Sequence, residues 1–449
     1  MLSLRNFASS SAQLCETAST MIEDYYNLNE LSAEQIGLLR LADKLGRENF
    51  APRTFDHDVN ASFPTENYND LREHGFLKLC VPQEYGGLGL HYWTYTLIAA
   101  EIGKHCGATA LTFNMHTSSM LWATYLPEMP TLTEQEQAEY RRLRVKLYRR
   151  VVDEGAIFSQ PISEGGVNWT SKPTQTNCRK VDGGYVINGL KKFASLAGNC
   201  DYYSIVCTEL FDGQAPRHED AMMFSVHKDT PGLIVKGDWD PLGMRGTVSR
   251  DLILQDVFVA EDERMMPQGA FIKTLPYWPH LFASLCPTYM GIAQGAYEFT
   301  VQYLSGTLPG QRPIDRRVYP TKRAAVGRMY RMLIQTRALW YQAMKESKPF
   351  PSQAEVMRLY AAVHAVMENA QAIAALAIRT CGGQSMLKTL PLERMYRDSR
   401  CGALMLPFTA EIMEDYLSML TLYDANEVDD ISAETVSARS SLYRPLKHR

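Results

Sequence analysis

The stretch from Ala156 to Gly198 limits most strongly how this chain can fold. Two runs of alternating apolar and β-branched residues flank glycine-rich turns, and Asp182-Gly183-Gly184 allows the positive φ that a tight hairpin needs. Short strands of this kind continue to about Asp262. Outside this region, apolar residues recur three and four positions apart, which is typical of helices. The pattern therefore predicts a sheet between two helical regions.

The helical regions carry start and stop signals of their own. Ser32, followed by Gln35, predicts a capping box, and Gly75 predicts the end of a short helix that begins near Asn67. The last three helices of the chain are apolar on more than one face, which favours a bundle and a subunit interface. The longer helices are expected at Thr94–Gly103, Ala108–Tyr125, Glu134–Arg150, Ala283–Leu304, Ala324–Ser347, Gln353–Thr380 and Leu392–Leu422.

We therefore predict a mostly α fold with a central β-domain. The helical N-terminal domain covers residues 1–154, the β-domain 155–268, the C-terminal helical bundle 269–425, and a polar tail 426–449. A chain of 449 residues is long enough for two or three domains with a sizeable core.

Composition excludes several classes of function. A hydrophobic content of 45%, a charged content of 21% and a net charge of −4 predict a soluble globular protein without a nucleic-acid footprint. The basic runs at Arg141–Arg150 and Arg312–Arg323 are interpreted as solvated helix faces. We find no apolar run close to the roughly 20 residues that span a bilayer. The nine cysteines lack metal-ligand spacing, which predicts reduced thiols, no metal site and a cytoplasmic location. The N-terminal segment is only weakly similar to a transit peptide.

Four sequence blocks resemble the acyl-CoA dehydrogenase superfamily, and they follow its order and spacing over almost the whole chain. They are VPQEYGGLGL at Val81–Leu90, SQPISEGG from Ser159, GGYVINGLKKFASLAG from Gly183, and PLGMRGTVSRDLILQDVFVAED from Pro241. The resemblance implies an N-terminal helical domain, a β-barrel or sandwich in the middle and a C-terminal four-helix bundle. It also implies FAD as cofactor, an acyl-CoA or acyl-carrier-protein substrate, and a homodimer or homotetramer.

The resemblance assigns a flavin-binding role to particular residues. Phe158 and Ser159 would line the pyrimidine side of the flavin, Phe193 would pack beside the ring, and the Ser195 hydroxyl would lie near N5. A hydrogen-bond donor at N5 tunes the electronics of the ring. The alternative is that these are core and turn residues of strands.

Further cofactor contacts are implied near the end of the chain. The Gly382-Gly383 pair would approach the cofactor of a neighbouring subunit, although it could also be a helix C-cap. Thr409 and Glu411 would contact the phosphates, ribose or adenine. Two features depart from the family pattern. Arg312 would take the place of the usual arginine, but the Phe and Gln that follow it in the family have no clear counterparts here. The flavin loop has Gly165 and Gly166 in place of Ser and Asp, which implies weaker or rearranged FAD binding.

The catalytic base is the main departure from the family. The two positions where family members carry it are occupied by Pro407 and Leu281, neither of which can abstract a proton. His280 is the nearest titratable neighbour, and Tyr277 is another. His116, on an apolar helix, could face a substrate cavity or be a structural group.

Three hypotheses follow from these residues. The first is desaturation of an acyl thioester with a relocated base. The second is a flavin-dependent monooxygenase or oxidase on the same fold, which needs no α-proton base. The third is a catalytically silent binding or scaffold protein.

Overall fold

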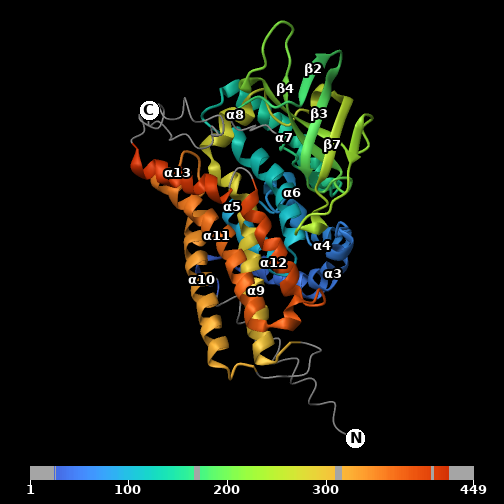
Figure 1. Cartoon of the computed structure of the whole chain (residues 1–449). Coiled ribbons are helices and arrows are strands. Elements are labelled where there is room, and N and C mark those ends of the chain that lie inside the picture. Colours follow the sequence, from blue (N-terminus) through green and yellow to red (C-terminus); the bar gives the residue numbers. More distant parts are fainter. Residues whose placement is uncertain (1–24, 26, 166–171, 309–315, 406–408, 424–449) are drawn as a thin grey trace.

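The computed structural model describes residues 25, 27–165, 172–308, 316–405 and 409–423. The helices that precede the sheet include α2 (Ala33–Leu45), α3 (Ala51–Asn60), α4 (Thr65–Glu73), α5 (Tyr92–His105), α6 (Gly107–Tyr125) and α7 (Glu134–Asp153). The strands follow, and the remaining helices include α8 (Ala270–Thr274), α9 (Cys286–Ser305), α10 (Pro320–Lys345), α11 (Gln353–Cys381), α12 (Pro391–Cys401) and α13 (Ala410–Leu422). Figure 1 shows the strands gathered at one end, beside the long rods of α9, α10 and α11.

The sheet has the order β1-β4-β2-β3-β7-β6, and β5 pairs with the other side of β4. The predicted hairpin is confirmed, because β2 and β3 pair antiparallel from Val181 opposite Gly184, and Gly183 has φ +75°. The pairing of β3 with β7 shifts register between Lys191 and Ala194. The strands are β1 (Phe158–Ser159), β2 (Asn177–Val181), β3 (Gly184–Ala194), β4 (Tyr202–Glu209), β5 (Ala221–His227), β6 (Leu233–Lys236) and β7 (Arg250–Ala260).

Helices α5 and α9 cross at glycines, and this crossing joins the N-terminal helices to the bundle. A Cβ atom at Gly291 would lie 2.1 Å from the Ala100 carbonyl oxygen, and one at Gly103 would lie 2.6 Å from the Thr288 oxygen. These distances leave no room for a side chain, so only glycine allows the two backbones to approach this closely. The predicted capping box of Ser32 and Gln35 is confirmed at the start of α2.

Two expectations from the sequence are wrong. The single helix expected at Leu392–Leu422 is instead α12 and α13, because the helix ends at Cys401 and a 3₁₀ turn follows at Gly402–Leu404. The basic face of α7 is not simply solvated. Arg150 and Lys146 both bind the carboxylate of Glu263 beside the sheet, at 2.8 and 2.7 Å.

Helix α11 is the one described helix that is, by length and composition, long and apolar enough to cross a membrane. In this structure it packs against α9, α10 and α12 in the bundle, and residues such as Val363, Val366 and Ala370 are fully buried. A single helix of this kind is also what the core of a helical bundle requires.

Candidate functional site

Two turns that are distant in sequence meet at one edge of the sheet. The first is at residues 193–197, where β3 ends, and the second is at residues 244–249, just before β7. The Leu196 N–H donates to the Thr247 oxygen at 3.0 Å, and the Ala197 N–H donates to the Val248 oxygen at 3.2 Å. We call residues 193–197 and 244–249 together the two-turn junction.

The backbone of the two-turn junction is strained. Seven non-glycine residues in the described part of the chain have positive φ, and four of them lie here. Each such residue costs of the order of 1–3 kcal/mol, and residues of this kind cluster at functional sites. Val248 is β-branched, which makes its left-handed conformation particularly unusual. The four are Phe193 (φ +54°), Leu196 (+67°), Met244 (+56°) and Val248 (+46°).

The Ser195 side chain stands at the surface end of a row of hydroxyl groups in this junction. Ser195 is half-buried, and its Oγ lies 2.8 Å from the Oγ of Ser249. The Ser249 Oγ is 2.7 Å from the Thr247 Oγ1, which donates to the Met244 oxygen at 2.8 Å. Ser159 on β1 donates its hydroxyl to the Ser195 carbonyl oxygen at 2.5 Å. The structure therefore brings together Ser159 and Ser195, two of the residues singled out in the sequence.

The junction presents an exposed aromatic ring, and the residue after Ser159 carries an unused polar group; a flat, polar aromatic ligand would require both kinds of group. Phe193 is 69% exposed and meets the Trp239 ring edge-on, with centroids 6.3 Å apart. Exposure of a large aromatic ring on a strained backbone is unfavourable unless something covers it. Next to Ser159, the Nε2 atom of Gln160 is buried without a hydrogen-bond partner, and it could donate to a ring carbonyl.

Beneath the turn, a buried ion pair joins β3 to the loop after β1. The Lys191 Nζ lies 2.6 Å from the Glu164 Oε1, and the two side chains are 0% and 1% exposed. Burial alone would raise the pKa of Glu164, but Lys191 and the peptide N–H groups of Gln175 and Thr176 hold it below its usual value. The carboxylate is therefore structural rather than a proton acceptor for substrate.

Phe158 lies in the core rather than at an open surface. Its ring stacks on Tyr202 with centroids 5.2 Å apart, and its N–H donates to the Nδ1 of His116 at 3.1 Å. His116 in turn donates from Nε2 to the Leu77 oxygen at 2.7 Å. The two ring nitrogens of His116 thus tie α6 to β1 and to the 3₁₀ turn at Phe76–Lys78, which is a structural role. The ring and the N–H of Phe158 are therefore both engaged inside the protein.

Burial lowers the pKa of His116 to about 4, so acid should weaken the fold. Between this value and the ordinary 6.5, the unfolded chain binds a proton that the folded chain does not, and stability falls as the pH falls. Full titration corresponds to about 3 kcal/mol. We expect His116→Gln, which cannot titrate, to remove this part of the acid-induced loss in urea unfolding between pH 7 and pH 4. The control variant His74→Gln, at an exposed histidine, should keep the full acid-induced loss of stability. An unchanged pH dependence of stability in His116→Gln would contradict the structural role of His116.

The residues at and beside Leu281 offer one proton acceptor, the Nδ1 of His280, which is buried without a hydrogen-bond partner. Leu281 is fully buried and Phe282 is 8% exposed. His280 is also buried, its Nε2 donates to the Ala343 oxygen at 3.2 Å, and burial lowers its pKa to about 4. The His280 ring packs edge-on against the Tyr92 ring. Neither residue belongs to the two-turn junction.

The other predicted cofactor residues are spread over the structure. Gly382 has φ +86° and caps α11 through its N–H to Ile378, so the C-cap interpretation is confirmed, and a Cβ at Gly382 or Gly383 would meet nothing within 4 Å. Thr409 precedes α13, and Glu411 is exposed in its first turn. Gly165 is exposed near Lys192. Gly166 and Arg312 lie outside the described residues.

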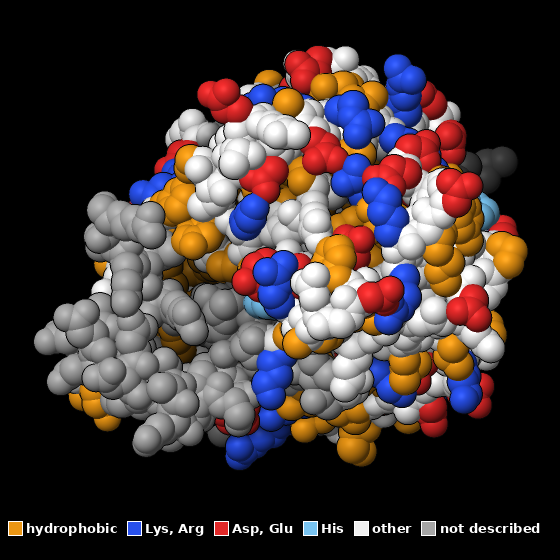
Figure 2. Space-filling view, turned by 90° about the horizontal axis from the view of Figure 1, so that it is seen from above, with side chains coloured by type: hydrophobic (Ala, Val, Ile, Leu, Met, Phe, Trp, Pro, Cys, Tyr) orange, Lys and Arg blue, Asp and Glu red, His pale blue; other side chains and the backbone are white. Residues whose placement is uncertain are grey.

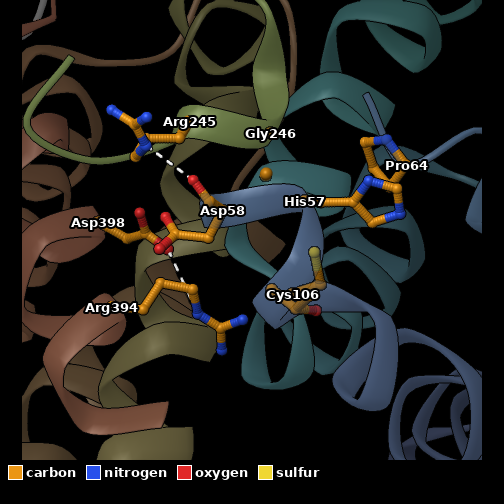
Figure 3. Close-up of a pocket in the computed structure, with 10 residues that line it drawn as sticks. His57, Asp58, Pro64, Cys106, Arg245, Gly246, Arg394 and Asp398 are labelled. Atoms are coloured by element: carbon orange, nitrogen blue, oxygen red, sulfur yellow. Dashed lines mark hydrogen bonds and ion pairs between the residues drawn. The ribbon is translucent and has the colours of Figure 1, made fainter. Parts of the chain in front are cut away.

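A small pocket beside the second turn, lined in part by Arg245 and Gly246 of that turn, was not predicted from the sequence. The Met244 N–H donates to the Asp398 Oδ1 of α12 at 2.6 Å, and burial raises the pKa of Asp398 to about 6. In Figure 3, Asp398 and Arg394 approach Asp58 and Arg245 across this pocket. The pocket is lined by Thr54, His57, Asp58, Pro64, Cys106, Ala108, Arg245, Gly246, Arg394 and Asp398.

No metal centre is evident in the part of the chain that is described, and charges of both signs are mixed on the face seen in Figure 2. The described part contains no group of three or more His, Cys, Asp or Glu side chains that could hold a metal ion. Figure 2 shows basic and acidic side chains interspersed over one face of the molecule, with hydrophobic side chains between them. Such mixing is unlike the basic stripe of a nucleic-acid-binding surface.

Comparison with protein families gives three matches in chain order. Residues 32–127 match the acyl-CoA dehydrogenase N-terminal domain, residues 162–257 the middle domain, and residues 283–413 the C-terminal domain. The middle match contains Ser195 and the whole two-turn junction.

Individual relatives differ in what their names say they do. The chain is 28% identical over 372 residues to the putative acyl-CoA dehydrogenase YdbM of Bacillus subtilis (80% of this chain, 91% of the relative). It is 27% identical over 405 residues to L-evernosamine nitrososynthase of a Micromonospora species (86% and 90%). The FMN-bound structure of TdsC from Paenibacillus sp. A11-2 superposes with a TM-score of 0.73 at 20% identity, covering 86% of this chain and 97% of that one.

Proposed function

Since the chain belongs to the acyl-CoA dehydrogenase family, we propose that it is a flavin-dependent oxidoreductase whose flavin ring lies against the two-turn junction. The exposed Phe193 ring, the half-buried Ser195 hydroxyl and the unused Gln160 amide support this position. A bound flavin supplies two-electron redox chemistry that side chains lack. Phe193 would cover the ring, and Ser159 would hold the Ser195 turn in place. FAD is the cofactor that we propose.

We propose further that the reaction is oxygenation by a flavin monooxygenase, rather than desaturation of a thioester. The observation that carries this choice is the filled base position, because Leu281 and Phe282 are buried hydrophobic residues there and the sequence has proline at 407. Desaturation requires a positioned base, whose contribution is roughly 10²–10⁴ in rate. Oxygenation at a flavin needs none. The similarity to L-evernosamine nitrososynthase supports an oxygen-using reaction.

Desaturation of an acyl-CoA or acyl-carrier-protein substrate is the second candidate, and the similarity to YdbM favours it. His280 and His116 are the bases that this reaction would have to use. Both are buried, and each already donates a hydrogen bond to a backbone oxygen. A neutral imidazole takes up a proton at its other nitrogen. In His116 that Nδ1 already accepts the Phe158 N–H, whereas in His280 it has no hydrogen-bond partner but is buried.

One experiment separates the two reactions. The protein, loaded with FAD, is mixed without oxygen with a series of acyl-CoA thioesters, and the visible flavin band is followed. We expect no bleaching. The chemically reduced protein is then exposed to oxygen with an amino sugar, the substrate class in the name of the Micromonospora relative, and a product that has gained one oxygen atom is expected. Rapid bleaching by a thioester would overturn oxygenation in favour of desaturation, and inertness in both assays would favour a silent protein.

We also propose a homodimer or homotetramer in the cytoplasm. The turn after α11 leaves Met386 and Leu387 66% and 56% exposed, beside the open Gly382-Gly383 backbone. A second copy would cover these apolar side chains. Sedimentation of the purified protein tests this, and a monomer at micromolar concentration would contradict it.

A further inference from the structure

The hydroxyl groups of Ser195, Ser249 and Thr247 form a continuous row that ends on a backbone carbonyl. The contacts measure 2.8 Å from Ser195 to Ser249, 2.7 Å from Ser249 to Thr247 and 2.8 Å from Thr247 to the Met244 oxygen. Ser249 and Thr247 are 6% and 1% exposed, so water does not interrupt the row. Each hydroxyl has one proton to donate.

Counting protons fixes the direction of the row. The Met244 oxygen can only accept, so the Thr247 proton is committed to it. The Thr247–Ser249 contact then requires Ser249 to donate, and the Ser195–Ser249 contact requires Ser195 to donate. With all three bonds made, Ser195 has no proton left for a ligand, and it presents only lone pairs to whatever lies against it.

The row can reverse at modest cost. If Ser195 donates to a ligand, Ser249 can donate to Ser195 and Thr247 to Ser249, and only the bond from Thr247 Oγ1 to Met244 is lost. The Met244 oxygen then still accepts from the Thr247 N–H at 3.0 Å and from the Trp239 Nε1 at 3.2 Å. Reversal therefore leaves no carbonyl without a donor, and it costs about one hydrogen bond.

We propose that Ser249 and Thr247 are positioning residues that set the hydrogen-bonding direction of Ser195 toward the flavin and thereby favour its reduced form. This rests on the proposed function, which places the ring against Ser195. A flavin ring nitrogen that accepts a hydrogen bond when oxidised carries an N–H when reduced. The reduced ring can donate to Ser195 while every bond of the row is kept, whereas the oxidised ring requires the reversed row.

The end of the row is itself fixed by the C-terminal bundle. Met244 has φ +56°, and its N–H is held by Asp398 of α12 at 2.6 Å. Asp398 faces Arg394 of its own helix, with 3.9 Å between the Arg394 Nε and the Asp398 Oδ2. The carbonyl on which the row ends is thus anchored by a helix outside the β-domain, so its position does not depend on the exposed turn.

The test uses Thr247→Val, which keeps the shape of the side chain but removes the hydroxyl, at a residue behind Ser195 and Ser249. Dissociation constants of the intact protein for oxidised and reduced FAD are measured, together with the potential of the bound flavin. We expect the preference for reduced over oxidised flavin to fall about tenfold, a decrease in potential of about 30 mV for a two-electron couple. Ser249→Ala should shift the preference in the same direction, and the double variant should add little.

Thr274→Val is the matched control, since Thr274 is a fully buried threonine whose hydroxyl also donates to a backbone oxygen, that of Ala270. It should leave the potential unchanged. Thermal unfolding checks that each variant is folded. If the Thr247→Val variant does not fold, the Ser249→Ala variant decides the test. Wild-type potential in a folded Thr247→Val or Ser249→Ala variant that binds flavin overturns this inference alone. Failure of the wild-type protein to bind any flavin overturns the proposed function as well.

Discussion

Replacing Lys191 by methionine is expected to lower the free energy of unfolding by about 3–5 kcal/mol. The change leaves the Glu164 carboxylate buried without its countercharge, because the two side chains are 2.6 Å apart and almost completely inaccessible. Burial lowers the pKa of Lys191 and the carboxylate opposes this. We consider both groups charged, since Glu164 also accepts from the Gln175 and Thr176 N–H groups at 2.6 and 3.0 Å. Urea unfolding measures the loss.

Two further variants make this prediction specific. Lys191→Met combined with Glu164→Gln removes both charges and should recover much of the stability. Lys180→Met breaks an exposed pair with Glu261, whose atoms are 3.6 Å apart, and should cost less than about 1 kcal/mol. A Lys191→Met protein within 1 kcal/mol of the wild type would show that the pair does not hold the loop after β1.

Alanine at Gly291 is expected to cost about 3 kcal/mol, the upper part of the range for overpacked cores. Its Cβ would lie 2.1 Å from the Ala100 oxygen and 2.7 Å from the Lys104 nitrogen, both backbone atoms of α5. No side-chain rotation relieves such a contact, so α5 and α9 must move apart. The same measurement of unfolding by urea applies.

Gly37→Ala is the control for this prediction. Gly37 is also inside a helix, α2, but a Cβ there meets nothing within 4 Å. Because alanine favours the helix, this variant should be roughly 0.5–1 kcal/mol more stable than the wild type. Equal effects at the two positions would mean that backbone propensity, rather than the contact between α5 and α9, governs both.

Local signals in the sequence predicted local structure well. The glycines at 183 and 184 predicted the β2–β3 hairpin, and Ser32 with Gln35 predicted a capping box, because such features depend on a few neighbouring residues. The break between α12 and α13 was missed, since the apolar periodicity continues through it although the helix ends at Cys401. Periodicity reports which face is buried, but not whether the backbone stays helical.

The candidate site was only partly predictable for a similar reason. Resemblance to a family drew attention to Ser159, Phe193 and Ser195, and the structure brings these residues together near one turn. The partners of Ser195 lie some fifty residues later, at Thr247 and Ser249, and no local pattern links them to it. The interior place of Phe158 depends on its contacts with Tyr202 and His116, which only the folded chain reveals.

The most direct test of the central claim, a flavin ring held against the two-turn junction, is a titration of the purified protein with FAD and with FMN, followed by flavin fluorescence and visible absorbance. We expect one flavin per chain, and roughly tenfold weaker binding in Phe193→Ala, which removes an aromatic contact. Phe258→Ala, which alters another exposed phenylalanine of the same sheet, should bind as the wild type does. Absence of flavin binding, or undiminished affinity in Phe193→Ala, would contradict the claim.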